Sequence, residues 1–377
     1  MSLNRLISQP RARSLIERMV LENRLPHALL FWGPAGSGKS VAAIELARWL
    51  NCRRGLDGPC DICASCVQFR TLEHAHFSYL LPVPGKALVD SEEGELTAEG
   101  AVQIAEILKR KGQEPYSLAE YPGGQNILIG QIRALLQWAS KRAFDHLPQL
   151  ALIDHAHRLR EEAANALLKL LEEPPPNFIL LLTAPAQEDI LPTLRSRCQA
   201  VEFDRLKAET VEQTLRQKAG LDEASSSRVA RLCGGNLSRA LEFAAKPQEA
   251  EQLYELAINI VRYSLGRNPL EFNPLLESWS QRGYEDQLLV LEIISAWLRD
   301  AAILQSLGDA AQPKIIHQDR LDLLHKFVAN CPRADFAEAT FRVDEARRYL
   351  EGRALAPLTL ISLARDLYRA IYQKQPV

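Results

Sequence analysis

The chain has 377 residues, of which 47% are hydrophobic and 24% are charged, and its formal net charge is −2. This length allows two or three globular domains of ~100–200 residues each, with enough apolar residues to bury a sizeable core. The near-neutral charge excludes an overall positive field for nucleic acid, so any DNA contact must be local or shared with partner chains.

No part of the sequence indicates export or a membrane. The first ten residues lack the charged stretch and apolar core of a secretory signal. The longest strongly apolar run, Phe178–Thr183, is far too short to cross a bilayer. We therefore expect a soluble, cytoplasmic protein with no membrane partner.

Residues 1–203 alternate short apolar segments with helical patterns, which favours a mainly parallel sheet. The candidate strands are Ala28–Trp32, Phe77–Pro82, Leu150–Ile153, Ile179–Thr183 and Ala200–Phe203. Residues 84–125 combine an acidic run, Asp90–Glu95, with a candidate helix, Ala101–Lys111. We interpret them as an insertion between two core strands, and the basic stretch Lys109–Lys111 as a solvated helix face.

The first strand leads into a glycine-rich loop that is followed by a helical stretch, Val41–Leu50. The loop consists of Gly33, Pro34, Ala35, Gly36, Ser37, Gly38, Lys39 and Ser40. Its spacing is that of a phosphate-binding loop, whose backbone N–H groups cradle phosphates at the start of a helix. Lys39 would neutralise phosphate charge, and the Ser40 hydroxyl could bind Mg²⁺. The flanking strand and helix favour this interpretation over a glycine-rich turn without a ligand.

Four of the seven cysteines, Cys52, Cys60, Cys63 and Cys66, fall within one short window. Three of them have the spacing CxxCxxC, and with the fourth they can surround one ion as a tetrahedron. In a reducing compartment, structural Zn²⁺ is favoured over disulfides. An iron–sulfur cluster is the rival interpretation. Cys198, Cys233 and Cys331 are interpreted as buried free thiols.

Asp154 follows the strand Leu150–Ile153, where a carboxylate can hold Mg²⁺ opposite the phosphate loop. A strand-end Asp that merely caps a turn is the alternative. A helix, Ala163–Leu171, comes next and is stopped by three prolines. Arg197 then lies in a loop from which it could enter a neighbouring subunit's nucleotide site, although a lone surface Arg more often pairs with a local carboxylate.

After Phe203 only helical patterns follow. Residues 205–245 predict a small helical unit, and Arg267–Pro274 separates the first two of the later helices. These predicted helices are Glu251–Leu265, Asp286–Leu304, Arg320–Asn330, Phe336–Leu350 and Leu358–Gln373. Each has apolar residues at spacings of three and four, and therefore a face to bury.

Together, these motifs resemble the bacterial clamp-loader subunits of the AAA+ ATPase class. The resemblance covers residues 5–245 and rests on five features besides the glycine-rich loop: the cysteine module, Gln131–Arg133, Asn165–Pro174, Leu194–Cys198 and Gly234–Arg239. It implies an α/β P-loop NTPase module with a parallel sheet at residues 1–203, which contains the zinc module (about 52–66) and the insertion (about 84–125). A helical lid at 204–247 and an all-α collar, an oligomerisation domain, at 248–377 would follow.

The resemblance also implies a function in DNA replication. Such subunits assemble as a hetero-pentamer with delta and tau/gamma subunits in the DNA polymerase III holoenzyme. They load the sliding clamp on primed DNA, in the cytoplasm at the nucleoid, and are not themselves polymerases. The family further implies Arg197 as an arginine finger that acts on a neighbour's ATP, and Thr183 as a residue that senses the nucleotide.

Two departures indicate a stator of the delta-prime type instead of a motor. ATPases of this class place a Glu after the strand-end Asp, whereas this chain has His155, which gives no fixed negative charge. The motor subunits' lid arginine aligns with Ser238, and Arg239 stands one residue later. We expect ATP or ADP to bind with weak or absent hydrolysis. The alternatives are an ATP-hydrolysing motor of the tau/gamma type and an unrelated nucleotide-binding enzyme.

Overall fold

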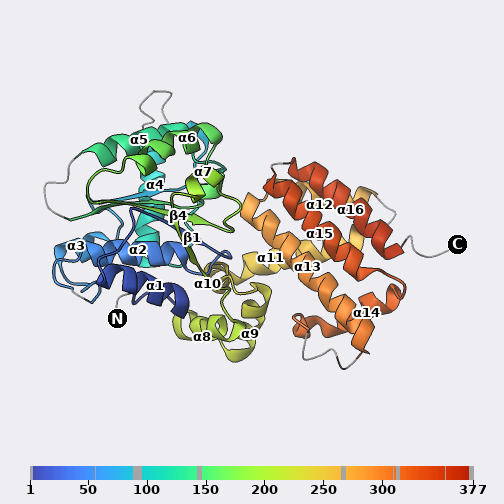
Figure 1. The fold of residues 1–377 in the computed structure, drawn as a ribbon. Helices are drawn as coiled ribbons and strands as arrows, with labels where there is room; N and C mark the ends of the chain where they lie inside the picture. The colour runs from blue at the N-terminus through green and yellow to red at the C-terminus, as the bar shows by residue number, and fades with distance from the viewer. Residues whose placement is uncertain are drawn as a thin grey trace. The chain divides into compact units, whose positions relative to one another are not determined.

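The computed structural model describes residues 3–55, 57–87, 96–141, 147–264, 269–308, 310, 315–352 and 354–372. They divide into two compact units (Figure 1). The first comprises Met1–Thr214 with Gly235–Glu242, and the second comprises Leu215–Gly234 with Phe243–Val377. The three helices of the predicted lid, α8 (Ala208–Ala219), α9 (Glu223–Leu232) and α10 (Leu237–Ala245), are therefore divided between the units.

The first unit contains a five-stranded parallel sheet with the strand order β2-β3-β4-β1-β5. The strands are β1 (Ala28–Trp32), β2 (Phe77–Leu80), β3 (Gln149–Ile153), β4 (Phe178–Ala184) and β5 (Gln199–Glu202). All five predicted strands are confirmed to within one or two residues. The three central strands are almost wholly buried and apolar, as strands covered on both faces must be.

Helices cover both faces of this sheet (Figure 1). One face packs against α5 (Ile129–Ser140) and α6 (Glu161–Glu172), whose buried residues share a core with β1, β3 and β4. Helix α2 (Lys39–Leu50) contacts β3 and β4, and α1 (Pro10–Leu21) contacts β5. Helix α6 confirms the helix predicted at Ala163–Leu171, and it buries Leu167, Leu170 and Leu171.

The insertion between β2 and β3 contains α4 (Ala98–Gln113), which confirms the predicted helix and extends it. The acidic run Asp90–Glu95 lies outside the described residues. The end of α4 packs closely against the segment that follows the cysteine module, because a Cβ atom at Gly112 would lie 2.4 Å from the carbonyl oxygen of Arg70. A short helix, α3 (Ala64–Gln68), carries the last cysteine of that module, and another, α7 (Pro192–Arg195), precedes Arg197.

The second unit contains only helices among its described residues. Apart from α8 and α9, they are α11 (Pro247–Ser264), α12 (Pro269–Gln281), α13 (Tyr284–Leu307), α14 (Leu321–Asn330), α15 (Phe336–Glu351) and α16 (Ala356–Tyr372). Helix α13 contacts α11, α14 and α15, so it is the central element of the bundle. The predicted helix ends Leu265 and Gln373 lie outside the described residues.

One helix of this bundle contradicts the sequence prediction. We expected Arg267–Pro274 to be a separating segment, but residues 269–274 begin α12, which has Pro274 inside it. A proline inside a helix removes a backbone hydrogen bond, but α12 packs against α11 and α16 and buries Trp279 completely. The indole N–H of Trp279 also donates to the Ala356 carbonyl at 2.9 Å. Tertiary packing therefore outweighs the local effect of the proline.

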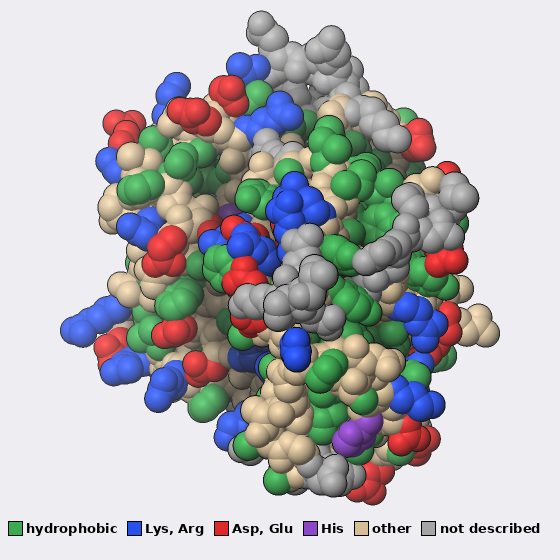
Figure 2. All heavy atoms as spheres, turned by 90° about the vertical axis from the view of Figure 1, so that its right-hand side faces the viewer, with side chains coloured by type: hydrophobic (Ala, Val, Ile, Leu, Met, Phe, Trp, Pro, Cys, Tyr) green, Lys and Arg blue, Asp and Glu red, His purple; other side chains and the backbone are tan. Residues whose placement is uncertain are grey.

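Figure 2 views the molecule from the side of the C-terminal helices, where basic and acidic side chains are interspersed with hydrophobic ones. Such a mixed surface gives no strong field of one sign on this face. None of the helices in the described residues is both long enough and apolar enough to cross a membrane.

Candidate functional site

The predicted phosphate loop, Asp154 and Thr183 meet at one edge of the sheet. Gly33 follows β1, Asp154 follows β3, and Thr183 lies near the end of β4, which runs between these two strands. Parallel strands place their carboxyl ends at the same edge, and ligands of open α/β sheets bind there. The fold therefore brings together residues that are 150 positions apart in sequence.

The phosphate loop has the backbone conformation that its glycines predict. Gly33, Gly36 and Gly38 all have positive φ angles, of 140°, 69° and 101°. Gly38 immediately precedes α2, so the loop leads directly into the positive end of that helix. Ala35 is exposed, whereas Ser37 and Gly38 are buried. The Lys39 ammonium donates to the carbonyl oxygens of Gly33 and Pro34 at 2.6 and 2.7 Å.

Lys39 is therefore folded back on its own loop. Burial lowers the pKa of Lys39 to about 8, although the Asp154 carboxylate opposes the shift. At neutral pH the lysine is still mostly protonated, and a phosphate could replace the two carbonyl oxygens as its partner. The loop can accordingly bind an anion at the start of α2.

Asn236 of the Gly-Gly-Asn-Leu-Ser-Arg segment contacts the phosphate loop. A Cβ atom at Gly36 would lie 2.0 Å from Oδ1 and 2.7 Å from Cα of Asn236. We predict that Gly36→Ala lowers the free energy of unfolding by about 1–3 kcal/mol more than a glycine replacement without this overlap, which is the usual range for overpacking. Urea denaturation of the purified chain would measure the difference.

The matched control is Gly123→Ala, which is in the same unit. Gly123 has a φ of +74°, close to that of Gly36, but its Cβ position has no neighbour within 4 Å. Both variants thus introduce the same backbone strain. Equal losses of stability in the two variants would show that Asn236 can move away from the loop at no cost.

Asp154 is buried among polar partners. The Tyr79 hydroxyl donates to Asp154 Oδ2 at 2.6 Å, and the Thr183 hydroxyl donates to Oδ1. Burial alone would raise the pKa of this carboxyl, but the positive charges of His155 and Lys111 and these two hydrogen bonds lower it to about 2. Asp154 is therefore ionised at neutral pH, and both its oxygens are already engaged.

The next residue, His155, has a left-handed backbone with a φ of 57°, and its N–H donates to the Thr183 hydroxyl at 2.9 Å. Its ring lies 5.7 Å from that of His157. Burial, followed by the charges of His155 and Arg158, lowers the pKa of His157 to about 3. His157 is thus neutral at pH 7, and neither histidine offers the negative charge with which a glutamate would polarise water.

Two residues of this site were not predicted from the sequence, and one of them was interpreted wrongly. Tyr79 went unnoticed, and Lys111 was interpreted as part of a solvated helix face. In the structure, Lys111 is only 3% exposed, and its ammonium donates to the Ser117 carbonyl at 2.7 Å. Burial lowers the pKa of Lys111 to about 8, although the negative charges of Asp154 and Glu120 oppose this shift. The signal for Tyr79 was its place near the end of a strand that pairs with the strand before Asp154.

Arg197 lies at the surface in the loop between α7 and β5. Its guanidinium donates to the Thr193 carbonyl at 3.0 Å and to the Glu172 carboxylate at 2.9 Å. The side chains of Arg197 and Glu172 are 38% and 52% exposed. A surface pair of this kind contributes only about 0–1 kcal/mol, so Arg197 can leave Glu172 at little cost.

Arg239, the other arginine considered for the nucleotide site, is buried and donates to the Glu242 carboxylate at 2.7 Å. Its backbone N–H also donates to the Asn236 side chain at 3.1 Å. Ser238, at the position of the motor subunits' lid arginine, is likewise buried.

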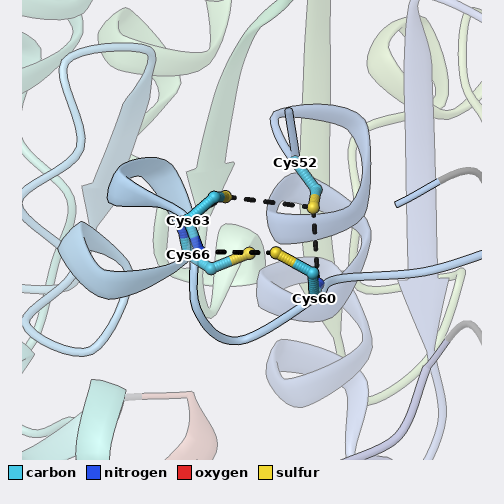
Figure 3. Close-up of side chains that lie close together, drawn as sticks. All are labelled: Cys52, Cys60, Cys63 and Cys66. Carbon is cyan, nitrogen blue, oxygen red and sulfur yellow. Dashed lines mark hydrogen bonds between the residues drawn. The ribbon is translucent and has the colours of Figure 1, made fainter. Parts of the chain in front are cut away.

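The four cysteines of the module converge, and Figure 3 shows their sulfur atoms pointing toward a common centre. All four Sγ atoms lie within 4.8 Å of one another, and those of Cys52 and Cys63 are 4.0 Å apart. Four thiolates around one Zn²⁺ at 2.3 Å lie about 3.8 Å apart. In an iron–sulfur cluster, several irons and bridging sulfides separate the cysteines. The geometry therefore favours a single tetrahedral ion.

Backbone N–H groups point at these sulfur atoms, as the thiolate form requires. Gly55 and Cys60 donate to Cys52 Sγ at 3.2 and 3.3 Å, and Cys66 donates to Cys63 Sγ at 3.5 Å. Burial opposes ionisation of Cys63, but backbone hydrogen bonds from Cys66 and Arg53 and the neighbouring thiols of Cys60 and Cys66 lower its pKa to about 6. With four protein ligands the site would be closed, which is typical of structural zinc.

A groove of about 540 Å³ lies in the second unit, lined by residues of α15 and α16. Its lining includes arginines and carboxylates, among them Arg342, Arg365 and Asp366. It contains none of the residues that the sequence analysis proposed for nucleotide, metal or catalysis.

Comparison with known proteins identifies relatives of the whole chain. Residues 8–207 match a family model described as "DNA polymerase III, delta subunit". The chain is 26% identical over 347 residues to DNA polymerase III subunit delta' of Bacillus subtilis, and the match covers 91% of each protein. It is 25% identical over 364 residues to subunit gamma/tau of Mycobacterium tuberculosis, of which it spans only 56%.

Among solved structures, a Thermotoga maritima protein related to the DNA polymerase III gamma subunit is similar over 96% of this chain and 99% of that one. Their sequence identity is 16% and the TM-score is 0.40.

Proposed function

Since this chain belongs to the clamp-loader subunit family of DNA polymerase III, we propose that it serves as the delta-prime stator of the loader. In this function it supplies Arg197 as an arginine finger to the ATP of a neighbouring motor subunit. The finger stabilises the charge that develops on the transferred phosphoryl group, and so couples ATP hydrolysis to loading of the sliding clamp on primed DNA.

The observation that carries this proposal is the exposure of Arg197 and the weakness of its local contacts. The guanidinium is exposed on the surface and, among the described residues, is held by the Thr193 carbonyl and the exposed carboxylate of Glu172. A finger needs such a position, because it must exchange its local partners for a phosphate on another subunit. Glu172 lies in Asn165–Pro174 and Arg197 lies in Leu194–Cys198, so two of the motifs on which the resemblance rests contact each other through this pair.

The chain's own nucleotide site has a supporting function in this proposal. The phosphate loop holds ATP or ADP through Lys39 and the backbone N–H groups at the start of α2. Hydrolysis by this site is weak or absent, because His155 occupies the position at which a carboxylate would orient the attacking water. A bound nucleotide then stabilises the subunit, and its hydrolysis does not drive clamp loading.

Structural Zn²⁺ bound by the four-cysteine module keeps the end of α2 in place. Cys52 comes two residues after that helix, and the buried Arg48 of α2 forms an ion pair with Asp61 inside the module. Arg48 also pairs with the buried Glu45. The zinc module is thus tied to the same helix that begins at the phosphate loop.

We further propose the three-part organisation expected from the sequence: an AAA+ module to residue 203, a lid to 247 and a helical collar beyond it. Through the collar the chain would join delta and tau/gamma subunits in a hetero-pentamer. Contacts with the sliding clamp and with primed DNA would be made mainly by the assembled complex, in keeping with a net charge of −2.

Reconstitution tests this function. The chain should form a stable complex with delta and the motor subunits in native mass spectrometry, with one copy per assembly. Clamp loading on primed DNA should be lost when it alone is omitted. Loading at full rate in its absence, or incorporation of several copies in place of motor subunits, would contradict the stator assignment.

A further inference from the structure

Tyr79 occupies the place between the two groups that should hold magnesium. Strand β2 pairs with β3 in the register Tyr79↔Leu152, which sets the phenol beside the Asp154 side chain. The hydroxyl donates to Asp154 Oδ2 at 2.6 Å, and the Ser40 side chain hydrogen-bonds to the phenol from the phosphate loop. A chain of hydroxyl groups therefore links the partly buried Ser40 to the buried Asp154.

This arrangement does not fit Mg²⁺. In P-loop proteins, the loop Ser or Thr and the strand-end Asp hold the ion. Mg²⁺ requires near-octahedral oxygens at 2.0–2.1 Å and keeps several waters. Here the phenol hydrogen-bonds to both Ser40 and Asp154, and the Thr183 hydroxyl donates to the other carboxylate oxygen. The site thus offers a protonated hydroxyl, a hydrogen-bond donor, where the ion would need a free ligand.

The insertion supplies a positive charge beside the same carboxylate. Lys111 of α4 is buried, and its ammonium is fixed by the Ser117 carbonyl at 2.7 Å. Its charge acts on Asp154 strongly enough to help keep that group ionised. Lys39 and Lys111 both interact electrostatically with Asp154, and together their two ammonium groups can offset the charge of a nucleotide's phosphates without a metal.

We propose that the nucleotide site of this chain is independent of magnesium, with Tyr79 in the position of the ion and Lys111 supplying the compensating charge. The inference rests on the nucleotide binding proposed above and specifies it: the ligand is metal-free ADP or ATP. It also gives a second reason, besides His155, for slow hydrolysis, because such reactions need an ion that bridges the phosphate oxygens.

The test is calorimetric titration of ADP and ATP into the full-length chain, once with excess Mg²⁺ and once with EDTA. For the wild-type chain we expect the two dissociation constants to agree within about twofold. Tyr79→Phe removes only the hydroxyl and should make binding about tenfold tighter with Mg²⁺ than with EDTA, a change of 1.4 kcal/mol. Tyr254→Phe, at a buried tyrosine of the second unit, is the matched control and should behave as wild type.

Mn²⁺ gives an independent readout by electron paramagnetic resonance in the presence of ADP. The wild-type chain should retain no protein-bound Mn²⁺ in this site, whereas Tyr79→Phe should retain about one per chain. Wild-type binding that needs Mg²⁺ would overturn the inference and leave nucleotide binding intact. Failure of the wild-type chain to bind nucleotide under either condition would overturn both.

Discussion

Replacing Arg197 with alanine should abolish the stimulation that this chain gives to its motor partners while leaving the chain itself folded. An arginine finger contributes about 10³-fold or more to the rate at the nucleotide it contacts. The side chain is exposed and its pair with Glu172 is weak, so its loss should change the free energy of unfolding by less than about 1 kcal/mol. Steady-state ATPase of the reconstituted loader, with sliding clamp and primed DNA, would measure the effect.

Two variants serve as controls for Arg197→Ala. Arg195→Ala removes a partly buried arginine of α7 only two residues away and should preserve stimulation. Glu172→Ala removes the local partner of Arg197 and should also preserve it, because the finger acts only after it leaves that carboxylate. If the assembled loader keeps its full activity with Arg197→Ala, the finger assignment is wrong.

The double substitution Cys63→Ser and Cys66→Ser should release zinc and destabilise the first unit. Elemental analysis should find one Zn²⁺ per wild-type chain and none in the variant. Zinc binding in small modules contributes about 10–16 kcal/mol, and even a loss of a few kcal/mol would lower Tm by on the order of 10 °C. The destabilisation should extend beyond the module, because Asp61 of the module pairs with Arg48 of α2.

The control for the zinc variant is Cys233→Ala with Cys331→Ala, which removes two buried thiols of similar exposure outside the module. This control should keep its zinc. Its free energy of unfolding should fall below that of the wild type only by the cost of two small cavities. If the purified protein contains iron and shows a visible charge-transfer band, the zinc assignment is wrong and the module is an iron–sulfur site.

Much of the first unit could be predicted because its signals are local. Strand, glycine-rich loop and helix follow one another along the chain, and the cysteines of the module lie within fifteen residues. Each of these patterns involves residues that are close together in the sequence. The glycine-rich loop is set by backbone geometry, and the cysteine spacing is set by the ligands that a metal ion needs. The positive φ angles of the three loop glycines and the converging sulfur atoms are the geometric counterparts of those patterns.

Contacts between distant segments could not be predicted in the same way. Tyr79 and Asp154 meet because β2 pairs with β3, and no feature of either segment fixes that register. Lys111 is the last residue of a basic triplet that is typical of a solvated helix, but the fold buries Lys111 and leaves Lys109 and Arg110 exposed. The helix over residues 269–274 forms despite its proline because its partners α11 and α16 are far away in sequence.

The most direct test of the stator assignment is the steady-state ATPase activity of three samples with primed DNA and sliding clamp: this chain alone, the motor subunits alone, and the mixture. We predict no significant turnover by this chain alone and strong stimulation in the mixture that disappears with Arg197→Ala. Substantial turnover by this chain alone would show that His155 does not disable its site, and that the protein is an ATP-hydrolysing motor of the tau/gamma type.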